Sequence, residues 1–269
     1  MAHSTRFDSH EGLRECHVTH AEGYRASMTD FHEHEYYEIS LILSGNVRVL
    51  LHDRVQEGTA SRAVLTPPHS PHLMTLREHS FYSRTNLIFT DDFLADYLPE
   101  WPRLRALFGA HGNVILLSGE QVDLCNDLLC RIKEEGDGFR RRLLIFLLLS
   151  HLSEHAVSED VRPIAPYVLR AMEYIAAHYA KKFTAEELAE SVGVGRTTLF
   201  TAFRAATGIT PGEYTLRCRV RHATRLLREG LAEETVAELT GFVAPCNLIR
   251  AFKHCHGMTP KAYITQGGR

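Results

Sequence analysis

The sequence predicts an α+β protein with a β-rich N-terminal part and an all-helical C-terminal part. Residues 30–117 hold short segments rich in β-branched and aromatic residues, separated by turn signals. Several short strands at this spacing predict a sandwich or barrel. Residues 167–269 carry helical periodicity and an internal repeat. Two copies of one helical unit predict a tandem arrangement of similar supersecondary structures.

Bulk composition sets the broad class. The chain has 269 residues, of which 44% are hydrophobic and 23% charged, as in soluble globular proteins. Its longest apolar run, residues 143–149, is too short to cross a bilayer, and residues 1–12 lack the apolar core of a signal peptide. The 6 cysteines show no paired spacing. We therefore expect two domains, no membrane association and a cytoplasmic protein with reduced thiols.

The internal repeat relates residues 188–214 to residues 236–263. Residues 188–194 match residues 236–242 at an offset of 48, and the offset becomes 49 from Leu199 onward. The matched pairs are Leu199 and Leu248, Ala202 and Ala251, Phe203 and Phe252, Arg204 and Lys253, Gly208 and Gly257, Thr210 and Thr259, Pro211 and Pro260, and Tyr214 and Tyr263. Each copy reads as two helices joined by a tight turn, which predicts a pair of helix-turn-helix units.

The second helix of such a unit lies in the DNA major groove, so its outward positions are candidate DNA contacts. In the first copy, a capping box at Thr184 and Glu187 precedes a helix that begins near Arg196 and buries Leu199 and Phe203. In the second copy, a proline suits the first helical turn. The predicted contacts are Arg196, Thr197, Thr198, Phe200, Thr201 and Arg204 in the first copy, and Pro245, Cys246, Asn247, Ile249, Arg250 and Lys253 in the second.

A single helix over residues 214–229 joins the two copies and is rich in arginine. It can brace the two units at a fixed separation, about 34 Å if both second helices enter one face of the duplex. Its arginines either contact phosphates or form a solvated helix face. They are Arg217, Arg219, Arg221, Arg225 and Arg228.

Charge is distributed unevenly along the chain. The formal net charge is -3, yet residues 165–269 contain 14 Lys and Arg against 9 Asp and Glu. The remaining residues are therefore acidic overall. A basic C-terminal part joined to an acidic N-terminal part favours a DNA-facing domain, because phosphates attract the basic surface.

Polar residues mark one face of the β-rich region. If a strand runs unbroken from His32 to Ser44, its alternate residues, including His34 and Glu38, share one face. With His72 as a third histidine, this set could bind Zn²⁺, Mn²⁺ or Fe²⁺. The alternative is a metal-free pocket whose histidines bond to the backbone or to a ligand.

A second polar set lies on residues 81–89, where Tyr82, Arg84 and Asn86 alternate onto one face. These side chains can hydrogen-bond and stack on a polar ring such as a sugar. The alternative is that they are ordinary outward-facing polar residues. The predicted ligand-binding residues are His32, His34, Glu38, His72, Tyr82, Arg84 and Asn86.

Residues 118–158 read as two amphipathic helices that pack on the barrel or pair with another chain. The expected apolar positions are Val122, Leu124, Leu128, Leu129 and Ile132, and then Leu143, Leu144, Leu147, Leu148 and Leu152. Cys125 and Cys130 are expected on a buried helix face. Acidic residues and prolines at 159–166 predict a linker.

The β-rich region resembles the cupin fold family. The first cupin motif, HxH(x)3E(x)6G, is complete at His32, His34, Glu38 and Gly45. The second motif is partial at Pro67 and His72, and Ala60-Ser61-Arg62 replaces the usual Pro-Gly-Asp. The resemblance implies a barrel and, in cupins that have all the ligands, a bound metal.

The C-terminal part resembles the DNA-binding domain of the arabinose-regulator (AraC/XylS) family. The matching residues are Gly241, Phe242, Arg250, Phe252, Lys253, Gly257, Pro260 and Tyr263. The resemblance implies a cupin-like sensor over residues 1–117, dimer helices over 118–158 and a DNA-binding domain over 167–269. The implied partners are an operator duplex, a small-molecule effector, a second copy of the chain and the transcription machinery.

We expect a transcription regulator controlled by a small polar effector, such as a sugar, and no enzymatic activity. An activator is expected, while the residues themselves leave repression open. The alternatives are a metal-dependent cupin enzyme with a DNA-binding domain, and a metal or oxidant sensor that uses the histidines or Cys246. Because Cys246 and Ile249 replace residues that are usually more polar, we expect the first copy to read bases more strongly.

Overall fold

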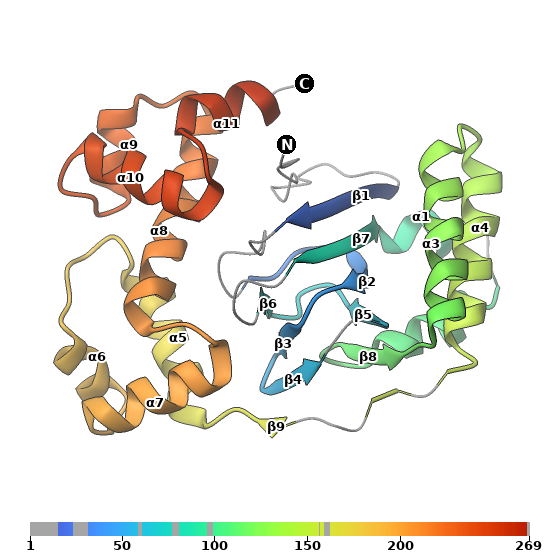
Figure 1. The fold of residues 1–269 in the computed structure, drawn as a ribbon, viewed down its shortest axis with the longest axis horizontal. Coiled ribbons are helices and arrows are strands. Elements are labelled where there is room, and N and C mark those ends of the chain that lie inside the picture. Colours follow the sequence, from blue (N-terminus) through green and yellow to red (C-terminus); the bar gives the residue numbers. More distant parts are fainter. Residues whose placement is uncertain are drawn as a thin grey trace. The chain divides into compact units, whose positions relative to one another are not determined.

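The structure, a computed structural model, describes residues 16–23, 32–58, 61–76, 81–95, 99–155, 157–158 and 162–267. The chain divides into two compact units (Figure 1). The first contains strand β1 and residues His32–Arg162, and the second contains Pro163–Arg269. Ala60 and linker residues 159–161 lie outside the described residues.

Two antiparallel sheets form the first unit. The five-stranded sheet has the order β1-β7-β2-β5-β8, and the other has the order β6-β3-β4-β9. The strands of the first sheet are β1 (Cys16–Gly23), β2 (Tyr37–Ser44), β5 (Arg62–Thr66), β7 (Tyr82–Phe89) and β8 (Asn113–Leu116). Those of the second are β3 (Val47–Leu51), β4 (Arg54–Gly58), β6 (His72–Leu76) and β9 (Arg162–Pro163).

The strand expected to run from His32 is broken. Strand β2 begins only at Tyr37, and His32 instead pairs through its backbone with His72, with N···O distances of 3.0 and 2.8 Å. Strand β1 was not among the predicted strands, yet it pairs with β7 along its whole length. Its sequence, CHVTHAEG, has too few large apolar residues for a clear strand signal.

The two faces of β2 and β7 have different environments because successive side chains of a strand alternate. Tyr37, Ile39 and Leu41 join one apolar core with the helices of the first unit. Glu38 and Ser40 point to the opposite face, where Tyr82 and Arg84 of β7 contact the sulfur of Met74 on β6. The space between the sheets is therefore polar at this end.

Helices cover the outer face of the five-stranded sheet. They are α1 (Asp91–Ala95), α2 (Trp101–Leu104), the 3-10 helix η1 (Arg105–Phe108), α3 (Gly119–Glu134) and α4 (Gly138–Leu152). A capping box at Ser118 and Gln121 begins α3. Helices α3 and α4 lie side by side in Figure 1, and α3 contacts β1, β2 and β7.

Several leucines predicted on the inner face of these helices are exposed instead. Leu124 is 46% exposed, Leu143 44% and Leu147 53%. Because Ile145, Leu148, Leu149 and Leu152 occupy the inner face of α4, Leu143 and Leu147 turn outward. The prediction for the cysteines is half right, since Cys125 is buried and Cys130 is exposed.

The second unit is entirely helical apart from its first residue, Pro163. Its helices are α5 (Pro166–His178), α6 (Ala185–Ser191), α7 (Arg196–Thr207), α8 (Pro211–Arg228), α9 (Glu233–Leu239), α10 (Pro245–His256) and α11 (Pro260–Gly267). Helices α6 and α7 form the first helix-turn-helix unit, and α9 and α10 form the second. The predicted capping box at Thr184 and Glu187 is present.

The two helix-turn-helix units share their turn geometry. Gly193 and Gly241 occupy the turns with φ values of 76° and 77°, and Gly208 and Gly257 end α7 and α10 with φ values of 82° and 76°. Positive φ is the conformation that glycine adopts without steric cost. The sequence repeat is therefore also a repeat of backbone conformation.

No helix within the described parts of the chain is long and apolar enough to span a membrane.

Candidate functional site

Helices α7 and α10 carry the predicted DNA contacts. Helix α7 begins at Arg196 after Gly195, which offers no capping side chain, and α10 begins with Pro245. The buried positions of these helices, among them Leu199 with Phe203 and Leu248 with Phe252, leave most of the candidate residues on the outward face. Exposed candidates are Arg196, Thr197, Thr198, Thr201, Arg204, Cys246, Asn247, Arg250 and Lys253, and half-buried ones are Phe200, Pro245 and Ile249.

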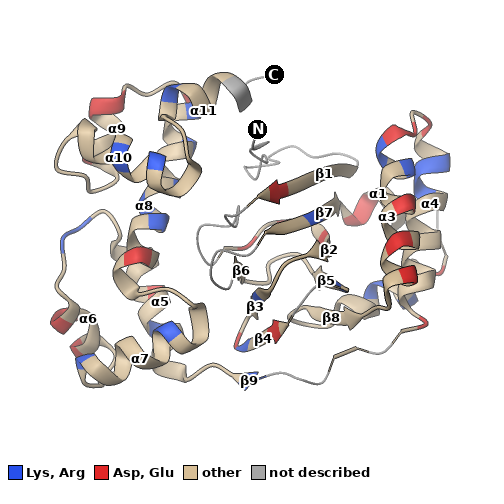
Figure 2. Cartoon of the chain, in the orientation of Figure 1, with Lys and Arg blue, Asp and Glu red and all other residues tan. Residues whose placement is uncertain are grey.

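The two helices of each helix-turn-helix unit differ in charge. Helices α6 and α9 carry acidic residues, whereas α7 and α10 carry basic residues and no acidic ones (Figure 2). The surfaces of α7 and α10 are thus suited to a polyanion, because their basic side chains attract phosphates and no acidic side chain on the same helix repels them.

Arg196 is held by two neighbours that sequence reasoning did not identify. Its guanidinium lies 3.0 Å from a carboxylate oxygen of Glu186 and 5.6 Å from the ring centroid of Phe200. The ion pair is exposed, so it contributes little to stability and leaves Arg196 available to a ligand. Its effect is to orient the side chain on the first turn of α7.

The arginines of α8 are used mainly within the protein. Arg217 pairs with Glu213 at 2.8 Å, and Arg225 pairs with Glu229 at 2.7 Å. The helix begins at Pro211, earlier than predicted, and therefore includes the acidic Glu213. Arg219 donates to the carbonyl oxygens of Tyr179 and Lys181. Arg217, Arg219 and Arg225 therefore have partners within the protein, which the sequence did not predict.

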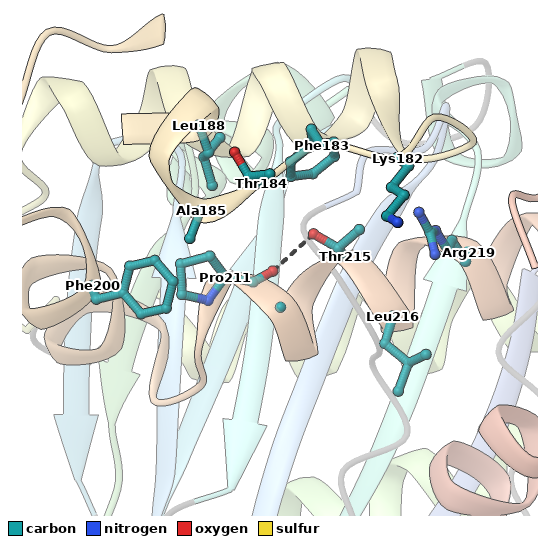
Figure 3. A pocket seen from close by; sticks show the side chains of 11 residues that line it. Lys182, Phe183, Thr184, Ala185, Leu188, Phe200, Pro211, Thr215, Leu216 and Arg219 are labelled. Carbon is teal, nitrogen blue, oxygen red and sulfur yellow. Dashed lines mark hydrogen bonds between the residues drawn. The ribbon is translucent and has the colours of Figure 1, made fainter. Parts of the chain in front are cut away.

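A groove of about 300 Å³ lies between the start of α6 and helices α7 and α8 (Figure 3). Phe200 and Pro211 lie toward one end of it in the figure, and Lys182 and Arg219 toward the other. A second groove of about 480 Å³ runs between α8 and α10 and also includes Arg219. Both grooves border the candidate DNA-binding helices.

In the first unit, the carboxylate of Glu38 is the centre of a buried polar network. His34 donates to its Oε2 at 3.0 Å, and Ser40 and Asn86 reach its Oε1 at 2.8 Å each. Asn86 faces Ser40 directly across the β2–β7 register. The strand alternation predicted that Ser40 shares the face of Glu38, but Ser40 was not among the predicted ligand-binding residues.

His72 completes this cluster with a defined tautomer. Its Nδ1 donates to the carbonyl oxygen of Ser70 at 2.9 Å, so a neutral ring has its lone pair on Nε2. That Nε2 is buried, lies 3.8 Å from Oε2 of Glu38 and has no hydrogen-bond partner among the described residues. Two acceptor atoms that face each other in this way favour a cation between them.

The donor atoms of His34, Glu38 and His72 lie within 4.8 Å of one another, which suits a metal with three N/O ligands and an open position. His32 is outside this set but packs against it, its ring 4.4 Å from the ring of His72. The residue types and the fixed tautomer therefore fit Zn²⁺, Mn²⁺ or Fe²⁺.

Tyr82, Arg84 and Asn86 are not outward-facing. Their exposed fractions are 2%, 0% and 1%, so the alternative of a solvated polar face is wrong. Arg84 reaches the hydroxyl of Ser40 at 3.4 Å, which joins it to the Glu38 network. The structure thus brings together two sets of residues, around 32–40 and 82–86, that are far apart in sequence.

The surroundings of Glu38 determine its charge. Burial raises the pKa of a carboxyl group, but the hydrogen bond from His34 and the proximity of the His34 and His72 rings, which attract the carboxylate when they are protonated, outweigh burial and hold the pKa of Glu38 well below its usual value. Glu38 is therefore ionised at neutral pH. An ionised, fully buried carboxylate requires the donors that surround it.

Two family models match the chain, an AraC-like ligand binding domain over residues 17–152 and a helix-turn-helix domain over residues 188–266. The chain belongs to the AraC family of transcription regulators. This AraC-family member is a DNA-binding transcription regulator with a ligand-binding domain.

Relatives of this AraC-family protein align along most of its length. The probable transcriptional regulator LumQ of Photobacterium leiognathi is 25% identical over 236 residues, covering 87% of this chain and 91% of that relative. The HTH-type transcriptional activator RhaS of Escherichia coli O139:H28 is 23% identical over 257 residues, 90% of each chain. ToxT from Vibrio cholerae, a solved structure, matches at 12% identity with a TM-score of 0.43, covering 94% of this chain and 98% of that chain.

The Glu38→Gln variant is expected to lower the free energy of unfolding by on the order of 2 kcal/mol at pH 7, because an amide replaces the charged acceptor of several buried hydrogen bonds. Since the folded-state pKa of Glu38 is depressed, its stabilisation is complete above the unfolded-state pKa and is lost as the pH falls through the folded-state value. The difference between wild type and variant should therefore shrink below about pH 4.5.

Urea unfolding of the full chain in the presence of EDTA, from pH 7 downward, measures this difference. Glu22→Gln is the matched control, since Glu22 is an exposed carboxylate of the same sheet and should change stability by less than about 0.5 kcal/mol. An equal loss in both variants, or a loss that does not depend on pH, would contradict the assigned ionisation of Glu38.

Proposed function

We propose that this AraC-family regulator binds a small polar effector, such as a sugar, between the two sheets of its first unit. The observation that carries the proposal is the buried polar network of Glu38, Ser40, Arg84 and Asn86. A ligand of matching polarity can exchange hydrogen bonds with these groups, whereas an apolar core would offer none. In this proposal residues 1–117 sense the effector, 118–158 dimerise, 159–166 link and 167–269 bind DNA.

The proposed effector acts by linkage. It can change DNA affinity only by the difference in its own affinity for the two arrangements of the regulator. We propose that the protein works in this way rather than as an enzyme, with the transcription machinery as a further partner. Its relatives are transcription regulators, which supports this role.

We also propose that α7 and α10 contact DNA through the twelve residues predicted from the sequence. Arginine makes bidentate hydrogen bonds to guanine in the major groove, so Arg196 and Arg250 are the strongest candidates for reading bases. Both are exposed in the first half of their helices, where contacts of this type are made.

The Arg196→Ala and Arg250→Ala variants are expected to weaken specific DNA binding by about 1–3 kcal/mol each, the loss expected for one bidentate base contact. The probe is a duplex selected from a random-sequence library by the wild-type full chain, and affinity is measured by fluorescence anisotropy. An unselected duplex is the control. Equal losses on both duplexes would show contact with phosphates alone and would contradict base reading.

Homodimerisation is proposed through the exposed stripe of α4. Phe139, Leu143 and Leu147 are spaced by four residues and are 59%, 44% and 53% exposed, and Leu124 of α3 is 46% exposed. Leucine side chains at this spacing lie on one face of a helix. A contiguous apolar stripe of this kind is typical of a helix that pairs with another chain.

The Leu147→Lys variant should therefore shift the full chain from dimer to monomer, because it places a charge within the stripe, and sedimentation velocity measures the change. Arg131→Ala, at an exposed ion pair of α3, is the control and should leave the dimer intact. Wild-type protein that sediments as a monomer at micromolar concentration would rule out this interface.

A second candidate function is metal sensing at His34, Glu38 and His72, favoured by the buried Nε2 of His72 that faces Oε2 of Glu38. A bound metal would act as a Lewis acid there. The three side chains would hold it and Ser70 would orient His72. Oxidation of the exposed Cys246 on α10 is a related sensor alternative, and a metal-dependent cupin enzyme is the other.

A thermal-shift screen of the full chain with sugars and with Zn²⁺, Mn²⁺ and Fe²⁺ separates these functions. A polar effector should raise the melting temperature of wild type even in EDTA, because ligand that binds only the folded state stabilises it. Under metal sensing, the metal should stabilise wild type and not His72→Ala. DNA affinity that stays unchanged with every stabilising compound would contradict effector control.

A further inference from the structure

The carboxyl end of α5 and the turn of the second helix-turn-helix unit meet at one arginine of α8. Arg219 donates from Nε to the carbonyl oxygen of Tyr179 at 2.6 Å and from a terminal nitrogen to that of Lys181 at 3.0 Å. Tyr179 is the C-cap of α5, where carbonyl groups have no partner within the helix. A guanidinium at this position satisfies the carbonyl groups and complements the negative end of the helix dipole.

The turn of the second helix-turn-helix unit lies directly against residues 179–181, the segment that Arg219 contacts. A Cβ atom built on Gly241 would be 2.4 Å from the carbonyl oxygen of Ala180, so only glycine allows the two backbones to approach so closely. The next residue, Phe242, has its ring centroid 6.0 Å from the guanidinium carbon of Arg219. Arg219 therefore contacts both the end of α5 and the turn of the second unit.

A third contact secures α8 to the same segment. The ring of His222, one helical turn after Arg219, stacks on Tyr179 with a centroid distance of 4.0 Å and an angle of 3° between planes. Burial, followed by the charges of Arg221 and Arg225, lowers the pKa of His222 to about 4. The ring is therefore neutral at physiological pH, and the stack is not affected by its titration.

These contacts connect the two helix-turn-helix units. Helix α5 packs on α6 and α7 of the first helix-turn-helix unit. The turn at Gly241 and Phe242 joins α9 to α10 of the second helix-turn-helix unit. Without this connection, the separation of α7 and α10 would depend on the packing of each unit on α8 alone. We define residues 179–181, Arg219, Gly241 and Phe242 as the inter-unit clamp.

We propose that Arg219 is a positioning residue that fixes the distance and angle between α7 and α10, and thereby the spacing between two DNA half-sites that the regulator accepts. The inference rests on the proposed DNA contacts of both helices. Inserting one base pair between half-sites moves the second by about 3.4 Å along the DNA and rotates it by about 34°. A clamped pair of helices cannot follow this change, whereas an unclamped pair can.

The test uses the full chain and a duplex selected by wild type from a random-sequence library, together with derivatives that have one base pair inserted or deleted between the half-sites. We expect each change of spacing to weaken wild-type binding by at least about tenfold, because one recognition helix loses its base contacts. Arg219→Ala should lower affinity for the selected spacing and reduce the spacing penalty to about threefold or less. Fluorescence anisotropy measures both quantities.

Arg225→Ala is the matched control, since Arg225 lies on the same helix, is exposed and pairs only locally with Glu229 in the described contacts. Its spacing penalty should equal that of wild type. Arg219→Lys keeps the charge but cannot span both carbonyl groups, so it should also reduce the penalty. This second variant keeps the test valid if circular dichroism shows that Arg219→Ala is unfolded.

A spacing penalty unchanged in the folded Arg219 variants would overturn the proposal. The proposal would also be overturned if the variants lost affinity equally at every spacing and the salt dependence of DNA binding fell by about one phosphate contact. Arg219 would then contact a DNA phosphate directly. Failure of the proposed function is distinguishable: Arg196→Ala or Arg250→Ala would then leave specific affinity unchanged, whatever the Arg219 variants do.

Discussion

Both helix-turn-helix units depend on the same aromatic contact. Phe203 of α7 meets Tyr214 edge-to-face at a centroid distance of 5.4 Å, and Phe252 of α10 meets Tyr263 at 5.3 Å, with interplanar angles of 77° and 75°. Helices α6 and α9 have seven residues each, too few to be stable alone. They persist because each packs on the second helix of its helix-turn-helix pair and on one further helix, α5 or α8, while the aromatic contact anchors the second helix to the helix that follows it.

The first unit is organised around the opposite requirement, the burial of a charge. An ionised carboxylate at Glu38 is stable only with hydrogen-bond donors around it, so the β2–β7 register must place Asn86 opposite Ser40, where both side chains reach the carboxylate. The interior between the sheets therefore cannot become a uniform apolar core. The same groups that satisfy Glu38 are those that a polar ligand would engage.

Arginine residues have distinct roles in the helical C-terminal unit. Arg196 and Arg250 remain exposed on the candidate DNA-binding helices, whereas Arg219 is used to hold backbone carbonyl groups. The planar guanidinium suits both roles because it offers several donors in a fixed geometry. What distinguishes the roles is the kind of partner within reach. Arg196 has an exposed carboxylate partner in Glu186, whereas the packing of α5 against α8 brings two backbone carbonyl oxygens to Arg219.

The sequence by itself determined the tandem repeat, the capping box at Thr184 and the glycine-ended helices, because all of these depend on local spacing and backbone conformation. The tertiary structure decided the rest. Contacts between segments far apart in sequence determine where strand β2 begins, at Tyr37. They also determine that Leu143 and Leu147 turn outward and that Arg219 holds backbone carbonyl groups. Periodicity shows that a helix or strand has two faces, but only the packing of distant elements decides which face is buried and which polar atoms meet there.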